Sequence, residues 1–243
     1  MIPLLATPAL VLHTTAYSES SVIAKVFTRQ LGVRSYILKG VRKSGGRTKQ
    51  NLLQPLSYLD LVVYNNPKNQ INYLKEIVPH RGGQPGTPAA PADDMARHAL
   101  RFFMTELLYK TLREEEPMPD LFDYVVDTLS EQDSHPKAHL PVTFMLSVSR
   151  HLGIEPLDNY SLREPLFDMQ AGRYQFSGSA TLDRPTSLLL HCFLQSLHGH
   201  TPAPAATLAQ RTELINRLLE YYQMHLTEFR NFHSHEILHS VLQ

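Results

Sequence analysis

The chain has 243 residues, of which 42% are hydrophobic, so it can bury one large core or two modest ones and is too apolar for wholesale disorder. Its net charge is zero, but residues 1–82 hold 11 Lys and Arg against 3 Asp and Glu, whereas residues 83–243 hold 12 against 20. A single cysteine, Cys192, excludes an internal disulfide framework and a four-cysteine zinc site, and no segment is apolar for long enough to span a membrane.

The first eighty residues alternate apolar and polar side chains over short β-branched segments, which is typical of strands. We predict strands over residues 9–15, 21–28, 33–39, 56–64 and 71–78. Leu31 and Gly32 supply a tight turn between the second strand and the third. Five short strands in about eighty residues indicate a small closed barrel of the OB type. The apolar start carries no Lys or Arg and is broken by Pro3 and Pro8, so we expect no signal peptide and a cytoplasmic protein.

Residues 81–94 are rich in Pro, Gly and Ala without a hydrophobic period, which indicates a linker. From Asp93 the period becomes helical, and Asp93 or Asp94 is expected to cap the first helix, which ends at the acidic run 114–116. Further helices are predicted at about 119–132, 138–152, 186–198, 207–226 and 234–242. Residues 153–185 interrupt them and include a short possible strand over 172–176. The prediction is a multidomain α+β chain: an OB-fold barrel over 1–80, a linker over 81–94, and an all-helical domain over 95–243 with a small irregular insert over 153–185.

Basic residues gather in a glycine-containing loop after the third strand and alternate with aromatic residues on the strands before it. Cations on such a loop can follow a phosphate backbone, and aromatic rings on an OB surface can stack on bases. The candidate DNA-binding residues are Lys25, Arg29, Arg34, Tyr36, Lys39, Arg42, Lys43, Arg47 and Lys49. A merely solvated loop is the alternative for the cations. For Phe27 a place in the barrel core is as good an interpretation as base stacking, which favours Tyr36 as the stacking residue.

The C-terminal segment His235-Glu236-Ile237-Leu238-His239 matches H-E-x-x-H, a motif that can bind zinc on a helix. The four residues after His239 offer no third ligand, so a solvated or packed helix face is the favoured interpretation, with a metal-dependent hydrolase as an alternative. Asp123 and Asp127 stand one helical turn apart, which usually marks a solvated face. With no convincing active site, we expect no enzyme, no cofactor and no metal.

Several segments, taken in order, resemble the RecO recombination mediators and in particular the Bacteroidetes type. These segments are residues 23–28, 31–32, 36–43, 53–56, 74–77, 152–156 and 167–174. None of these segments is a catalytic motif, but together and in this order they cover nearly the whole chain.

The resemblance implies an N-terminal OB-fold, a helical C-terminal domain, binding of single- and double-stranded DNA, and annealing of complementary strands. It also implies binding to the acidic tail of single-strand DNA-binding protein. Together with RecR, such a protein loads RecA on strands that are coated by that protein. Many RecO-like proteins carry a four-cysteine zinc insert in the region that matches 153–185. This region has no cysteine here, so we predict that packing around Phe167, Tyr174 and Phe176 holds it instead of zinc.

The tail of the single-strand DNA-binding protein is acidic and ends in apolar residues, so its pocket should combine cations with an apolar groove. The candidate partner-binding cations on the helices are Arg97, Arg101, Arg113 and Arg150. A protein-interaction adaptor whose basic domain contacts acidic proteins, not DNA, remains an alternative function.

Overall fold

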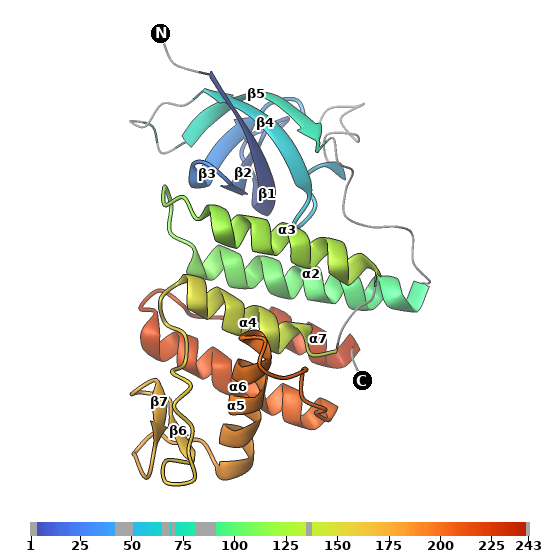
Figure 1. The fold of residues 1–243 in the computed structure, drawn as a ribbon. Helices are drawn as coiled ribbons and strands as arrows, with labels where there is room; N and C mark the ends of the chain where they lie inside the picture. Colours follow the sequence, from blue (N-terminus) through green and yellow to red (C-terminus); the bar gives the residue numbers. More distant parts are fainter. Residues whose placement is uncertain are drawn as a thin grey trace. The chain divides into compact units, whose positions relative to one another are not determined.

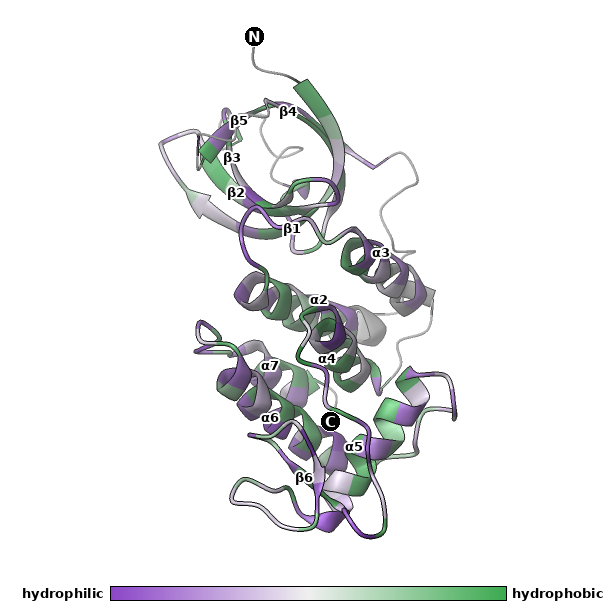
Figure 2. Ribbon diagram, turned by 60° about the vertical axis from the view of Figure 1, so that its left-hand side comes forward, coloured by the Kyte–Doolittle hydropathy of each residue, from purple (hydrophilic) through white to green (hydrophobic). Residues whose placement is uncertain are grey.

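The computed structural model describes residues 4–41, 51–64, 69, 71–80, 91–134 and 138–241. Five strands form a closed barrel in the order β1-β2-β3-β5-β4 (Figure 1). They are β1 Leu4–Ala16, β2 Val22–Thr28, β3 Gly32–Leu38, β4 Tyr58–Tyr64 and β5 Ile71–Pro79. Every neighbouring pair is antiparallel except β3 and β5, which run parallel. The predicted OB-fold barrel is therefore confirmed, and Figure 2 shows its strands closing into a ring.

The alternation of side chains along β2 divides the residues between the barrel interior and its outside. Val22, Ala24 and Val26 face the interior, where they belong to the buried core of the barrel. Phe27 points the other way, although it is completely buried. Its ring meets that of Phe122 edge to face, with centroids 5.3 Å apart. Neither interpretation of Phe27 from the sequence is therefore right: it is buried against a helix outside the barrel.

Six helices lie in the described part of the chain: α2 Pro91–Thr111, α3 Pro119–Ser134, α4 Leu140–His151, α5 Arg184–Leu197, α6 Leu208–His225 and α7 Ser234–Val241. Their number and order are as predicted. The expected capping by Asp93 or Asp94 is wrong, because α2 begins at Pro91 and both residues lie inside its first turn. None of the described helices combines the length and the apolar character needed to cross a membrane.

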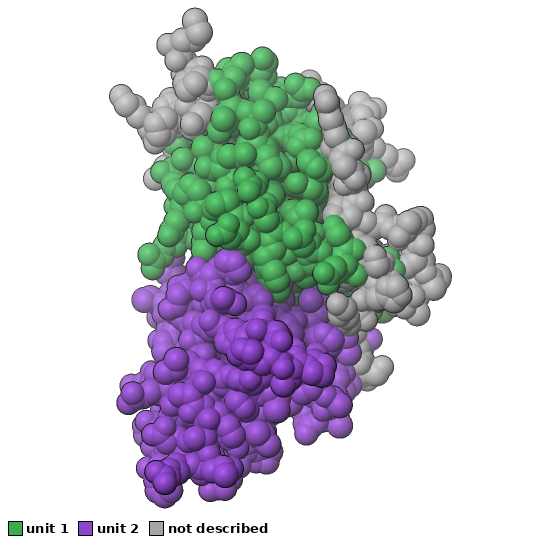
Figure 3. Space-filling model, viewed as in Figure 1, with its two compact units in different colours: residues 1–135 green, residues 136–243 purple. Residues whose placement is uncertain are grey.

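The chain divides into two compact units, Met1–His135 and Pro136–Gln243 (Figure 3). The first unit contains the barrel together with α2 and α3, whereas the sequence led us to expect a barrel over 1–80 and a helical domain from 95. Of the expected linker, residues 81–90 lie outside the described residues, and 91–94 form the first turn of α2. The second unit contains α4 to α7 and the insert.

The connection between α2 and α3, residues 112–118, runs against the start of β3, and we call it the strap. The amide of Glu115 donates to the carbonyl of Val33 at 3.1 Å, and Val33 and Glu114 form a parallel bridge. Gly32 lies against the strap, in a left-handed conformation with φ +66°. A Cβ atom on it would lie 2.3 Å from the carbonyl oxygen of Glu116. The close approach of the strap therefore requires glycine at this turn.

In the second unit, the insert contains a hairpin of β6 Leu166–Asp168 and β7 Arg173–Gln175, which confirms the short strand expected near 172–176. Phe167 and Tyr174 are buried as predicted, and the Tyr174 hydroxyl donates to the carbonyl of Ser187 at 3.0 Å. Phe176 was expected beside them, but it is 77% exposed, because it follows the last paired residue of the hairpin.

Polar side chains complete the insert. The Asn159 side chain accepts a hydrogen bond from the Tyr174 amide at 2.8 Å and donates to its carbonyl at 2.9 Å. The carboxylate of Asp168 accepts from the amides of Gln170 and Ala171 and from the Gln175 side chain. These bonds tie the strand, the turn and the neighbouring loop together without cysteine.

Candidate functional site

Two of the predicted DNA-binding cations, Lys25 on β2 and Arg29 in the turn after it, lie opposite carboxylates from residues 112–134 of the same unit. Lys25 Nζ is 2.9 Å from Glu114 Oε1 and lies 5.0 Å from the centroid of the Tyr109 ring. Arg29 donates to both carboxylate oxygens of Asp123, from Nε at 2.8 Å and from Nη2 at 2.7 Å. Their role in DNA binding stays a prediction, and in this structure their charges are matched by carboxylates.

Arg34 and Tyr36 lie on the opposite side of the strand pair. The Arg34 side chain is only 11% exposed, and its Nη1 is 2.5 Å from Glu115 Oε1. Tyr36 is 2% exposed in the barrel core, where burial raises the pKa of its hydroxyl to about 12. The prediction that Tyr36 stacks on bases is therefore wrong, because its ring is enclosed by the barrel.

An exposed aromatic and basic surface lies instead outside β3, β5 and β4. Tyr73 is 52% exposed and pairs in register with Ile37, and Lys39 Nζ lies 5.1 Å from the centroid of its ring. Val63 and Leu74 pair with their side chains toward the core. The next residues outward, Tyr64 and Tyr73, therefore lie side by side on the outer surface. We call Lys39, Tyr64, Tyr73 and the exposed Lys75 the outer face.

Lys39 is the one predicted DNA-binding residue that the structure places on the outer face. Arg42, Lys43, Arg47 and Lys49 lie outside the described residues. Tyr64 and Tyr73 were missed from the sequence, although their strands contain a usable signal: Leu61, Val63 and Leu74 are the apolar residues that must face inward. The tyrosines next to them then face outward.

The four helical arginines predicted to bind a partner are divided between the two units. Arg97 and Arg101 lie on α2 and are half-buried, and Arg113 is exposed just after that helix. Arg150 is at the end of α4 in the second unit, 3.9 Å from Glu155. These four residues therefore do not belong to a single site within either unit.

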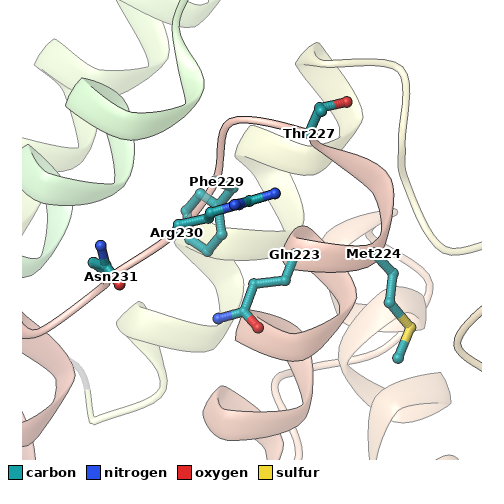
Figure 4. A pocket seen from close by; sticks show the side chains of 6 residues that line it. All are labelled: Gln223, Met224, Thr227, Phe229, Arg230 and Asn231. Carbon is teal, nitrogen blue, oxygen red and sulfur yellow. The ribbon is translucent and has the colours of Figure 1, made fainter.

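A pocket of about 550 Å³ opens at the end of α6, in the second unit (Figure 4). Its lining residues are Gln223, Met224, Thr227, Phe229, Arg230 and Asn231. Phe229 is buried and packs on the rings of Tyr222 and Phe232, with centroids 5.2 and 5.7 Å away, so that side of the pocket belongs to a packed aromatic cluster. Met224 and Arg230 are exposed, which places an apolar side chain and a cation at the same opening. Sequence reasoning missed this site because its residues have no motif spacing.

His235 and His239 lie on α7, with ring centroids 5.8 Å apart. His235 Nδ1 and His239 Nε2 are buried and have no hydrogen-bond partner within the described residues. Burial, with His235 nearby, lowers the pKa of His239. Over the parts of the chain that the structure describes, no three His, Cys, Asp or Glu residues are arranged to hold a metal ion.

Comparison with known proteins matches both parts of the chain to one family. The family model described as "Recombination protein O N terminal" matches residues 1–82, and "Recombination protein O C terminal" matches residues 92–231. The DNA repair protein RecO of Christiangramia forsetii is 28% identical over 243 residues, which cover 98% of this chain and 99% of that relative. The RecO proteins of Porphyromonas gingivalis and Bacteroides fragilis are 28% and 27% identical, and the alignments cover at least 95% of each chain. The chain belongs to the RecO family of DNA repair proteins.

Proposed function

We propose that this chain is a non-enzymatic recombination mediator that binds single- and double-stranded DNA and anneals complementary strands. It would assist the loading of RecA on strands coated by single-strand DNA-binding protein, together with RecR. Such a protein acts in the cytoplasm, at the nucleoid during repair. The observation that carries the proposal is the outer face of the barrel.

The outer face combines the two features that sequence-tolerant binding of a single strand needs. Tyr64 and Tyr73 present exposed rings on which bases can stack, and Lys39 and Lys75 supply cations for the phosphates. Because the Lys39 ammonium group lies over the Tyr73 ring, both side chains can contact the same segment of a DNA strand. The residues that follow Lys39 in the sequence include Arg42, Lys43, Arg47 and Lys49, which extend the cationic character of this part of the chain.

The proposal is tested by the annealing of complementary oligonucleotides coated with the cognate single-strand DNA-binding protein, with chelator present throughout. We expect annealing that weakens with salt and on charge reversal at Arg42, Lys43 and Arg47.

Tyr73→Ala should weaken single-strand binding roughly 5- to 100-fold, as the loss of one stacked base does. Tyr17→Ala, which removes another exposed tyrosine of the same unit, should not. If the protein binds no bare strand at low salt, the adaptor function takes precedence.

The pocket at the end of α6 is our candidate for the tail of the single-strand DNA-binding protein. Its size lies within the range of roughly 300–1,000 Å³ found for small-ligand sites, enough for the end of a peptide. Arg230 can bind carboxylates, and Met224 and Phe229 can receive the apolar end. Arg230→Glu should abolish binding of a tail peptide measured by fluorescence anisotropy, whereas Arg163→Glu, at an exposed position of the insert in the same unit, should leave it unchanged. Equal losses in both variants would contradict the pocket assignment.

A further inference from the structure

Away from the outer face, the described part of the barrel has two further cations, Lys25 and Arg29, that are paired with the protein's own carboxylates. Residues 1–82 carry 11 Lys and Arg against 3 Asp and Glu, and residues 91–135 carry 4 against 11. The structure brings these two segments into one compact unit. The helical part of the first unit therefore nearly cancels the charge of the barrel on which it packs.

Individual ion pairs match these charges at Lys25 on β2 and at Arg29 just after it. Glu114 holds Lys25 at 2.9 Å, and Asp123 accepts two hydrogen bonds from Arg29. A carboxylate that accepts two bonds from a guanidinium presents the same acceptors as two oxygens of a phosphate group. Asp120 adds further negative charge near Arg29.

Lys25 and Arg29 are more exposed to solvent than Arg34, the other barrel cation that is paired with a carboxylate. The side chains of Arg29 and Asp123 are 42% and 49% exposed, and those of Lys25 and Glu114 are 23% and 51% exposed. Solvent therefore reaches both pairs, and exposed ion pairs are weak enough for another anion to compete. The Arg34 side chain is only 11% exposed, so solvent reaches this cation less than the other two, although its partner Glu115 on the strap is 48% exposed.

We propose that Lys25 and Arg29 form a second phosphate-binding surface of the barrel, which Glu114 and Asp123 occupy in place of a phosphodiester backbone. This inference rests on the proposed DNA binding of the barrel and adds a site to it. While Glu114 and Asp123 occupy this surface, a DNA strand binds at the outer face. A phosphate backbone that displaces them gains the second surface, so that one barrel can hold two backbone segments.

The test compares the salt dependence of DNA binding in variants that uncover the surface. Glu114→Gln with Asp123→Asn removes both covering charges, and fluorescence anisotropy with labelled oligo(dT) measures the affinity over a range of salt concentrations. Each phosphate gained steepens the plot of log affinity against log salt by about 0.7 for a single strand, so we expect about 1.4. Asp123→Asn alone should give about half of that change and is a second test if the double variant does not fold.

Two controls separate a new contact from a mere change of net charge. Glu19→Gln with Asp127→Asn removes the same charge from exposed positions of the same unit and should leave the slope at the wild-type value. Glu115→Gln should lower the melting temperature without changing the slope, because Arg34 is too buried to meet a phosphate. Adding Lys25→Gln and Arg29→Gln to the uncovered variant should restore the wild-type slope.

Equal slopes in the uncovered variant and in the Glu19 and Asp127 control would overturn the inference, as would a steep slope that persists without Lys25 and Arg29. Failure of the proposed function gives a different result, because the wild-type protein would then bind no oligonucleotide at low salt. In that case the uncovered variant still decides: binding by the variant alone supports the covered surface, and binding by neither protein refutes it.

Discussion

Arg29, the residue after β2, and Asp123 on α3 are 94 positions apart in the sequence and share two hydrogen bonds of 2.8 and 2.7 Å. This pair fastens α3 to the outside of the barrel, beside the buried contact of Phe27 with Phe122. The Asp123 carboxylate therefore has a structural partner, whereas its spacing from Asp127 suggested only a solvated face.

The Arg29–Asp123 pair predicts a pH dependence of stability. The hydrogen bond from Arg29 lowers the pKa of Asp123 below its ordinary value of 3.8. The stabilisation is therefore fully present above that ordinary value and is lost as the pH falls through the lowered pKa of the folded protein. The urea midpoint of the wild type should exceed that of Asp123→Asn at pH 7, and the difference should shrink below about pH 4. A difference that does not vary with pH would contradict the ionic nature of the contact.

Gly32 and Gly40 form a matched pair for testing how the strap lies on the barrel. Both have positive φ, but a Cβ atom on Gly40 meets none of the described atoms within 4 Å, whereas one on Gly32 meets the backbone of Glu116. Gly40→Ala should cost only the conformational strain, about 1–2 kcal/mol. Gly32→Ala should cost about 3 kcal/mol or more, because the strap must move as well. Urea unfolding followed by circular dichroism measures both, and similar losses would show that the strap is loosely held.

The Phe27–Phe122 contact should be a major source of stability in the first unit. Both rings are almost completely buried, so Phe27→Ala should lower the free energy of unfolding by about 3–5 kcal/mol. A double-mutant cycle with Phe122→Ala should give a coupling energy of about 0.5–1.5 kcal/mol, as expected for an edge-to-face pair. A coupling energy of zero would mean that the two rings do not touch in solution.

The insert should owe its stability to hydrogen bonds and packing. Asn159→Ala removes two bonds to the backbone of Tyr174, each worth roughly 1 kcal/mol, and should lower the melting temperature. Gln170→Ala, at an exposed position of the hairpin turn in the same insert, should have little effect. Incubation with a chelator should leave the melting temperature of the wild type unchanged. A decrease on chelation would show that a metal contributes to the fold.

His239 predicts a second pH dependence, in a higher range. Burial lowers its pKa below the ordinary value of 6.5, so the unfolded chain takes up a proton at a higher pH than the folded protein does. Stability should therefore decrease as the pH falls below about 6.5. His239→Gln should flatten this decrease between pH 7 and 5, whereas substitution of the exposed His233 should not. Chemical denaturation at several pH values provides the measurement.

The strands, the order of the helices and the concentration of positive charge in the first eighty residues could all be predicted from the sequence. These properties depend on local alternation, helical period and composition, which are complete within short segments. The hairpin of the insert was also predictable in outline, because Gly172 marks its turn and Phe167 and Tyr174 mark its buried side.

Which face of each strand points into the barrel, and which element covers the other face, became known from the three-dimensional structure alone. Alternation along β2 and β3 separates two faces but does not say which one closes the barrel, so Tyr36 was assigned to the outside and Tyr73 was overlooked. The partners of Lys25, Arg29 and Arg34 lie 81 or more positions away in the sequence, beyond the range of any local pattern. The strap and α3, which supply those partners, pack on the barrel through contacts between residues far apart in the sequence, and this packing decides which cations of the barrel face carboxylates.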